Sequence, residues 1–219
     1  MPSRGPQVYV FNVQNPASPV YVRTIMSPSG GSAHDVSVVN GRLYLHDVNS
    51  GNTHIFDISN IEVTAPLLGS FYSGPATHSS WWTSDYNYLI VAQEPQSPGG
   101  TAGIFDVRDP ANVTRVATLD PVALGFGQIW PHEPRVVDNV LYFAWNTAGL
   151  KLFEITDPSD PILVGSYRTS STTAMDIDGN LDVFPHLGPD RVLASDLYEG
   201  LFVLDTAPTP TRSQAFAIQ

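Results

Sequence analysis

A short hydrophobic pattern recurs five times along this chain. Each copy has an apolar residue, an aromatic residue or leucine, then an acidic or amide residue, at 10–13, 55–58, 104–107, 152–155 and 203–206. The third and fourth spacings are about 48 to 51 residues, and the first two are similar. A repeat of this length is typical of a β-propeller, in which each repeat unit forms one small sheet, or blade.

Turn residues and apolar segments divide each complete unit into four predicted strands. Turns rich in Asp, Asn and Pro follow four of the copies, and a further apolar strand follows each turn. Upstream of the pattern, a strand is predicted at 42–47, 88–94, 140–146 and 191–196, and an innermost strand begins near His34, His78, His132 and Asp182. No stretch has a sustained helical period, so we predict an all-β propeller of four-stranded antiparallel blades.

The predicted units do not contain equal numbers of strands. Residues 7–26 supply only the two outer strands of a first blade, whereas the later units lie at 33–73, 77–120, 131–168 and 176–206, the last with three strands. We expect a single domain over residues 1–219, with five blades closed by the chain termini as the simplest arrangement. The alternatives are a fragment of a longer propeller, or an open arc that a second copy completes through the incomplete terminal blades.

The fourth unit resembles a known repeat. Residues 149–158 (GLKLFEITDP) and 161–167 (PILVGSY) are similar to LVIVD repeats, which build propeller blades. Residues 182–185, 192–196 and 200–204 are similar to the last repeat of choice-of-anchor B family proteins. The resemblance covers roughly residues 7 to 206 and is specific for the fold rather than for an activity. Because family members tend to be exported bacterial proteins, it implies a secreted or cell-surface location.

Composition excludes several classes of partner. Ten Lys and Arg residues against 21 Asp and Glu residues give a net charge of −11, which excludes nucleic acid as the main partner, because phosphate binding needs clustered positive charge. No apolar run is long enough for membrane insertion, and residues 1–6 lack the apolar segment of a signal peptide. Since the chain has no cysteine, histidine and carboxylate groups are the metal ligands that remain.

The repeat register brings candidate ligands to one mouth of the central channel. The innermost strand and its neighbour are antiparallel, so the start of one and the end of the other lie on the same face. The starts carry His34, His78, His132 and Asp182, and the ends carry Asp47, Glu94, Asn146 and Asp196. We predict that the three histidines hold a divalent metal, for which Zn, Mn and Fe are suited, and that Asp47, Glu94 and Asp196 bind ligand.

A structural role is the alternative interpretation of the three histidines. Residues repeated in phase often make the same buried hydrogen bond in every blade, and such a bond could tie each blade to its neighbour. Asp182 replaces the histidine in the last unit, and Asn146 replaces the acid in another. A pocket would tolerate these changes more easily than a structural bond would. If the pocket is catalytic, Glu133 is the predicted general base.

Aromatic residues near the same face are candidate ligand contacts. Trp145 and Tyr198 lie at the end of the second strand of their units, where a flat ring could stack on a sugar. Trp130 belongs to the apolar loop 121–131, which contains glycines and could act as a pocket wall or lid. The alternative is that Phe126, Ile129 and Trp130 of this loop pack on a neighbouring blade.

Three classes of function fit these features. The first is a binding or scaffold propeller that holds a small molecule, glycan or protein segment at the channel mouth. The second is a metal-assisted enzyme of hydrolase or lyase type, in which the histidines polarise substrate or water. The third is a purely structural repeat module. Propellers host all three, so the fold alone does not choose between them.

Overall fold

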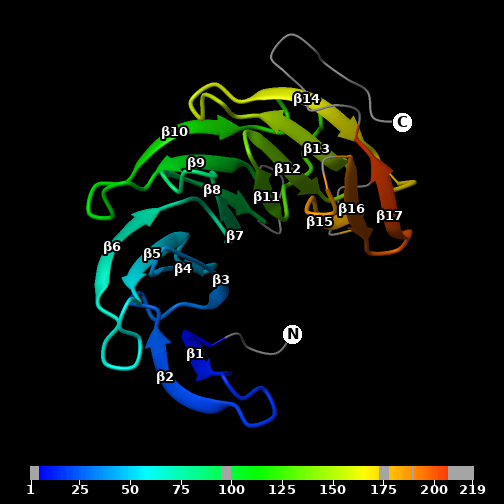
Figure 1. Cartoon of the computed structure of the whole chain (residues 1–219). Coiled ribbons are helices and arrows are strands. Elements are labelled where there is room, and N and C mark those ends of the chain that lie inside the picture. Colours follow the sequence, from blue (N-terminus) through cyan, green and yellow to red (C-terminus); the bar gives the residue numbers. More distant parts are fainter. Residues whose placement is uncertain (1–4, 95–99, 173–177, 189, 207–219) are drawn as a thin grey trace.

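The computed structural model describes residues 5–94, 100–172, 178–188 and 190–206. These residues form seventeen strands in five antiparallel sheets and contain no helix (Figure 1). The described part of the chain accordingly has no helix that could cross a membrane. Residues 1–4, 176–177 and 207–219, which the predicted domain and its last unit include, lie outside the described residues.

Within each sheet the strands follow their order in the chain. The first sheet has β1 (Gln7–Asn12) and β2 (Val20–Met26). The second has β3 (Ala33–Val39), β4 (Arg42–Asp47), β5 (Asn52–Asp57) and β6 (Leu67–Tyr72). The third has β7 (Thr77–Trp82), β8 (Tyr88–Gln93), β9 (Ala102–Asp106) and β10 (Thr114–Leu119). The fourth has β11 (Pro134–Val137), β12 (Val140–Trp145), β13 (Gly149–Glu154) and β14 (Ile162–Tyr167), and the fifth has β15 (Asn180–Phe184), β16 (Arg191–Asp196) and β17 (Gly200–Asp205).

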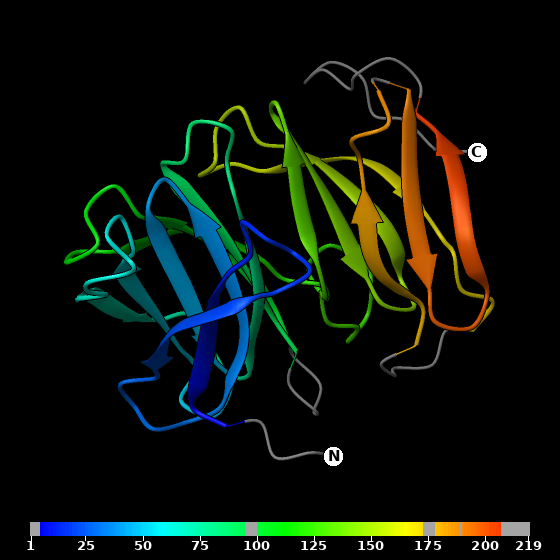
Figure 2. The same cartoon turned by 60° about the horizontal axis from the view of Figure 1, so that its bottom comes forward.

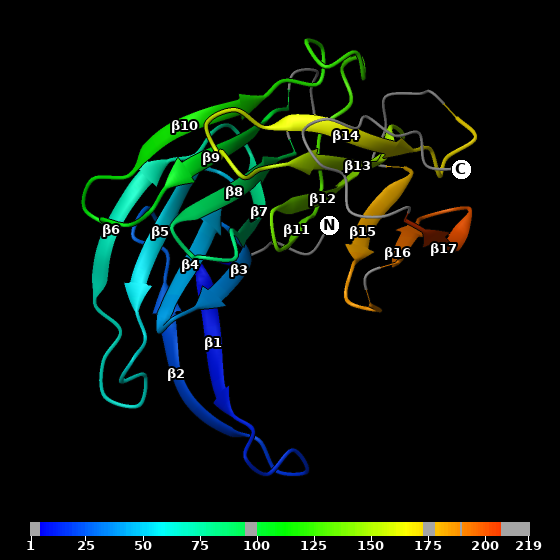
Figure 3. The ribbon, with the colours of Figure 1, turned by 45° about the horizontal axis from the view of Figure 1, so that its top comes forward.

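The sheets stand side by side as propeller blades. In Figures 1 and 3, β3, β7, β11 and β15 form the inner side of an arc, and β6, β10 and β14 form its outer side. The predicted order of two outer strands, three complete blades and three final strands is confirmed. Among the described strands, none joins the first sheet to the fifth, and Figures 1 and 2 show these sheets at opposite ends of the arc. Closure into a five-bladed ring therefore stays a prediction.

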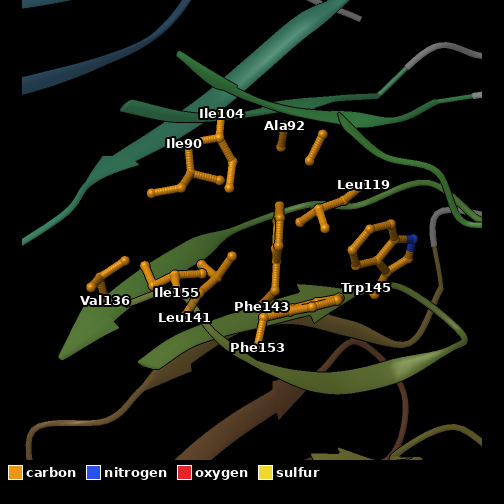
Figure 4. Packing of buried hydrophobic residues seen from close by; sticks show 11 residues of the cluster. Ile90, Ala92, Ile104, Leu119, Val136, Leu141, Phe143, Trp145, Phe153 and Ile155 are labelled. Carbon is orange, nitrogen blue, oxygen red and sulfur yellow. The ribbon is translucent and has the colours of Figure 1, made fainter. Parts of the chain in front are cut away.

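The hydrophobic core lies between neighbouring blades. Side chains of the third and fourth sheets, among them Ile90, Ile104, Phe143 and Phe153, interleave in one cluster (Figure 4). All six residues of β12 are buried, because this strand has a blade on each face. Gly149 begins β13 with φ 81°, and a Cβ there would lie 2.2 Å from the Tyr167 carbonyl oxygen, so glycine is required at this hairpin.

Every inner strand of the four later blades has a β-bulge near its start. In β3, β7 and β15 the register with the neighbouring strand shifts by one residue, around 33–35, 77–80 and 180–182. In the fourth blade both His132 and Glu133 bond to Ala144: the His132 N–H donates to the Ala144 carbonyl, and the Ala144 N–H donates to the Glu133 carbonyl, each at 2.9 Å. A bulge sets two residues opposite one and redirects their side chains.

The bulges define two in-phase positions along the channel. The first is occupied by His34, His78, His132 and Leu181. The second is occupied by Asp35, Ser79, Glu133 and Asp182. Asp182 is thus in phase with Glu133, and Leu181 stands where the other blades have histidine. This corrects the sequence register, which placed Asp182 with the histidines, because the bulge adds a residue that the repeat spacing does not reveal.

Candidate functional site

Three histidine rings from three consecutive blades lie against one another. The ring centroids of His34 and His78 are 4.0 Å apart, and those of His78 and His132 are 4.5 Å apart. We call these three residues the histidine row. The structure brings together the three histidines that the repeat register singled out, and their metal-binding role stays a prediction.

Glu94 follows the end of β8 and lies beside the histidine row. Its Oε2 is 3.0 Å from Nε2 of His78, and its Oε1 is 3.8 Å from Nε2 of His132. Burial alone would raise the pKa of Glu94, but the hydrogen bond from His78 lowers it overall, and so does positive charge on His78 and His132 whenever these rings are protonated. The Trp130 indole also lowers this pKa, although its Nε1 makes no hydrogen bond of good geometry. Glu94 is therefore a carboxylate at neutral pH.

The ring nitrogens of the row are unequally bonded. Among the described residues, Nδ1 of His34 and Nδ1 of His78 are buried and have no hydrogen-bond partner. In contrast, Nδ1 of His132 lies 2.6 Å from the Leu181 carbonyl, so this nitrogen donates and Nε2 keeps its lone pair on the side of Glu94. Burial and the neighbouring His78 lower the pKa of His132. A neutral imidazole held in this way is suited to bind a metal.

Two overlapping sets of side chains have the spacing of metal ligands. In the first set, His34, His78 and Glu94 each have one ligand atom that lies within 4.8 Å of those of the other two. The same is true of His78, His132 and Glu133 in the second set. Zinc bonds of about 2.0–2.2 Å to nitrogen and oxygen place tetrahedral ligands roughly 3.4 Å apart. The atoms of either set would therefore have to move closer together to coordinate one ion. His78 belongs to both sets and is the key residue of the site.

A charged layer lies next to the histidine row at the second bulge position. Arg135 on β11 donates from Nη1 to Glu133 Oε2 at 2.8 Å, and its Nη2 is 3.1 Å from the Asp182 carboxylate. Its guanidinium carbon lies 4.6 Å from the centroid of the Trp81 ring. Arg135 was not among the site residues predicted from the sequence. The available signal was a cation two residues after Glu133, which places both side chains on one face of a strand.

Glu133 has the proton affinity of a general acid or base. Burial raises the pKa of Glu133 to about 7 despite the charge and hydrogen bond of Arg135, and the charge of Asp35 contributes in the same direction. Burial also raises the pKa of Asp35. A carboxyl group that titrates near neutral pH can take or give a proton under working conditions. The catalytic role of Glu133 stays a prediction, because no substrate position is known.

The other two predicted ligand carboxylates are bonded to their own hairpin turns and to the loops that lead from the preceding blade. The carboxylate of Asp47 accepts hydrogen bonds from the hydroxyls of Ser27, at 2.5 Å, and Ser29, and from two backbone N–H groups of the following turn at 3.1 Å. Asp196 accepts from Thr169 Oγ1 at 2.7 Å and likewise from two N–H groups of its turn. Both cap a hairpin and fasten the loop that enters their blade. Neither belongs to a set of ligand atoms around the histidine row.

The three predicted aromatic contacts have different environments. Trp145 is fully buried among Phe126, Phe143 and Phe153, and its Nε1 donates to the Ile129 carbonyl at 2.6 Å, so its ring is part of the core and offers no face to a ligand (Figure 4). Trp130 is also buried, and its predicted role as a ligand contact stays a prediction. Tyr198 is 74% exposed, so it is the member of the three whose ring is accessible.

Comparison with known sequences agrees with this architecture. The LVIVD repeat profile matches residues 30–69 and 135–169, which lie in the second and fourth blades. The chain carries LVIVD repeats. Neither match includes residues 182–204, so the likeness of that segment to choice-of-anchor B proteins stays a prediction. A search of curated proteins finds no match.

Solved structures share the fold of this LVIVD-repeat chain. Periplasmic gluconolactonase from Pseudomonas aeruginosa superposes with a TM-score of 0.72 at 14% identity, over 93% of this chain and 60% of that protein. A putative 6-phosphogluconolactonase from Bacteroides fragilis superposes with a TM-score of 0.71 at 13% identity, over 96% of this chain and 62% of that protein. Sqt1 from Chaetomium thermophilum superposes with a TM-score of 0.66 at 13% identity, over 97% of this chain and 52% of that protein. The chain thus spans about 60% of the two lactonase-type structures, and identities this low establish the propeller fold alone.

Proposed function

We propose that this LVIVD propeller is a binding protein whose inner strands hold a divalent metal ion at the histidine row. The observation that carries the proposal is the cluster of His34, His78 and Glu94, whose ligand atoms lie within 4.8 Å of one another. In addition, the buried Nδ1 atoms of His34 and His78 have no hydrogen-bond partner among the described residues. Leaving a buried polar group without a partner costs about 1–3 kcal/mol. A metal ion at this place would give the imidazoles the partner that the described protein groups do not provide.

The donor set indicates which metals fit. His34, His78 and Glu94 offer two imidazoles and one carboxylate, a combination that binds Zn, Mn or Fe(II). Three protein ligands leave at least one coordination position free for a small molecule or a glycan with oxygen donors. An extracytoplasmic location, where such ligands are met, belongs to the same proposal and rests on the family resemblance.

The binding proposal is tested by metal titration of untagged protein after treatment with a chelator. We expect about one Zn, Mn or Fe ion per chain by elemental analysis and calorimetry. His78→Ala should weaken binding at least 100-fold, because both ligand sets include this residue. His186→Ala is the matched control, since His186 is exposed and belongs to neither set. Absence of stoichiometric metal, or equal affinity in His78→Ala, would refute the proposal.

A metal-assisted hydrolase is the second candidate function. It is favoured by Glu133, whose pKa is about 7 and which shares a ligand set with His78 and His132. In this case Glu133 would exchange the proton of a hydrolytic step on an ester or lactone. Glu133→Gln should abolish hydrolysis of such substrates and leave the binding of metal at His34, His78 and Glu94 intact. If the metal-loaded protein hydrolyses no lactone or ester, the hydrolase function is refuted and the metal-binding function remains.

A further inference from the structure

A second concave site lies on the fourth blade, apart from the histidine row. Its cavity has a volume of about 550 Å³ and is lined by loop 125–129, by residues 147–148, and by Lys151, Ser166 and Arg168. None of these residues belongs to the histidine row or to the charged layer. The volume is in the range of about 300–1,000 Å³ that is usual for small-molecule sites.

Lys151 is the only lysine of the chain, and it is buried in β13. Its ammonium group donates to the Ala148 carbonyl at 2.6 Å and to Ser166 Oγ at 2.7 Å, both of which are uncharged. None of the ion pairs formed by the described residues includes Lys151. A buried cation without a counter-charge is costly, so a negative group in the cavity would be strongly favoured.

A second cation strengthens the positive potential of the cavity. Arg168 uses its guanidinium to donate to the carbonyls of Ser170 and Thr172, and it also forms no ion pair among the described residues. Burial and the charge of Arg168 lower the pKa of Lys151 to about 8, and Lys151 stays mostly protonated at pH 7. A cavity lined by two such cations is unusual in a chain whose net charge is −11.

The cavity also has an apolar part, to which Phe126 and Ile129 contribute. The Phe126 ring centroid lies 4.6 Å from Lys151 Nζ. The loop is held in place because the Ile129 carbonyl accepts from Trp145 Nε1 at 2.6 Å. The site therefore presents a fixed apolar surface next to a buried ammonium group.

We propose that this cavity binds a small organic anion, with its acidic group at Lys151 and its apolar part on Phe126 and Ile129. The ammonium has three N–H donors, and two of them bond to Ala148 and Ser166. The third makes no hydrogen bond to a described residue; the Phe126 ring lies 4.6 Å from the nitrogen, and the anion would compete with this weaker contact for the third donor. A carboxylate or a phosphate monoester would supply the missing charge through a charge-assisted hydrogen bond.

Calorimetry with three aromatic probes tests the site at pH 7. Phenylacetate and phenyl phosphate carry the anion, and phenylacetamide is the neutral analogue. We expect at least one of the two anions to bind at least tenfold more tightly than the amide, and the better of the two identifies the acidic group. Equal binding of the amide, or no binding of either anion, would overturn the proposal.

Variants of the lysine assign the binding to this cavity. Lys151→Met should weaken anion binding at least tenfold and still fold, because it replaces a buried ammonium with an apolar chain of similar length. Lys151→Arg keeps the charge and should retain most of the binding. Arg191→Ala, which removes an exposed cation on β16, should change nothing. Unchanged anion binding in Lys151→Met would refute the assignment.

The unmodified chain gives an independent readout. Because Lys151 is the only lysine, its ε-amino group is the only side-chain amine that acetic anhydride can acetylate, and peptide mass spectrometry separates acetylated Lys151 from products at tyrosine hydroxyls and at the α-amino group. The anion that binds should slow acetylation of Lys151 at least fivefold and leave the α-amino group unaffected. Equal acetylation of Lys151 with and without a saturating anion would contradict the proposal.

Discussion

Two histidine environments in adjacent parts of the molecule differ in how fully their nitrogens are bonded. His46 on β4 is completely buried, and its Nδ1 and Nε2 contact Thr53 Oγ1 at 3.0 Å and Ser80 Oγ at 2.8 Å. In the histidine row, Nδ1 of His34 and Nδ1 of His78 are buried and have no partner in the part of the chain that the structure describes. Because buried polar groups in folded proteins are normally bonded, the difference separates a histidine that joins blades from histidines that can hold a ligand.

The bonding of His46 extends across a blade interface. Ser80 Oγ also lies 2.7 Å from Ser37 Oγ, which joins β7 to β3. Thr53 Oγ1 continues to Ser73 Oγ at 2.8 Å, and Ser73 donates to Thr77 at 2.9 Å. This network is the kind of structural bond that the in-phase histidines were also expected to make. His46, which makes this network, does not recur in the other blades. Within the row, His132 makes a comparable bond, since its Nδ1 lies 2.6 Å from the Leu181 carbonyl of the next blade.

The largest expected difference is in stability. His46→Ala should lower the free energy of unfolding by about 2–4 kcal/mol, because it opens a cavity and leaves Thr53 and Ser80 without their partner. His34→Ala should cost less than about 1 kcal/mol, since the ring is partly exposed and its Nδ1 is unbonded. Urea denaturation of both variants measures this difference. Equal losses in the two variants would show that the row is as structural as His46.

A metal should stabilise the protein only when the row is intact. At a free metal concentration 100 times the dissociation constant, binding to the folded state adds about 2.7 kcal/mol to the free energy of unfolding. We expect thermal unfolding of the wild type and of His186→Ala to shift upward with Zn or Mn, and that of His78→Ala to stay constant. An equal shift in His78→Ala would place the metal elsewhere.

The pH dependence of stability should separate Glu133 from His46. Glu133 has a pKa of about 7 in the folded protein against an ordinary 4.5, so its contribution to stability is present below pH 4.5 and is lost as the pH rises through 7. Burial lowers the pKa of His46 from 6.5 to about 3. The unfolded chain therefore takes up a proton at His46 below pH 6.5, and stability falls as the pH falls from 6.5 toward 3.

Glu133→Gln removes one of these opposing effects. Between pH 7 and pH 5 the variant should lose stability more steeply on acidification than the wild type, by about 1 kcal/mol per pH unit. Urea unfolding at pH 5, 6, 7 and 8 gives both curves. Parallel curves would mean that Glu133 does not hold its proton in the folded state.

The smallest expected effect is on stability, and it distinguishes Asp47, a carboxylate that caps a hairpin, from Glu94, a carboxylate proposed to bind metal. Asp47→Asn should lower the free energy of unfolding by about 1 kcal/mol, because an amide oxygen accepts the bonds of its turn more weakly than a carboxylate. It should leave metal binding unchanged. Glu94→Gln should do the reverse, weakening metal binding at least tenfold with little change in stability. A metal-binding defect in Asp47→Asn would contradict the assignment of Asp47 as a hairpin cap.

The strand order of the blades could be predicted from the sequence because its signals are local. Apolar segments, Asp/Asn-Pro turns and the repeat length give each strand its place without any distant contact. The bulges escaped prediction, since an extra residue changes the pairing of a strand and not its composition. Asp182 was therefore assigned to the wrong position, although His132–Glu133 and Leu181–Asp182 form a recognisable dipeptide pattern.

The roles of other site residues depend on contacts between distant segments. Asp47 accepts bonds from a loop of the preceding blade, and Trp145 is covered by Phe126 from another loop. Neither contact leaves a trace in the spacing of the repeat. Lys151 did carry a signal, a lone lysine within an apolar strand, whose meaning appeared only when its lack of an acidic partner was known.

Anomalous diffraction from metal-soaked crystals of the untagged protein would show where the metal binds. We expect one strong peak about 2.0–2.2 Å from a ring nitrogen of His78. Its other protein ligands should be Glu94 with His34, or Glu133 with His132, as the two sets allow. A map with no peak at the histidine row, or with metal bound only at other histidines, would contradict the proposed metal site.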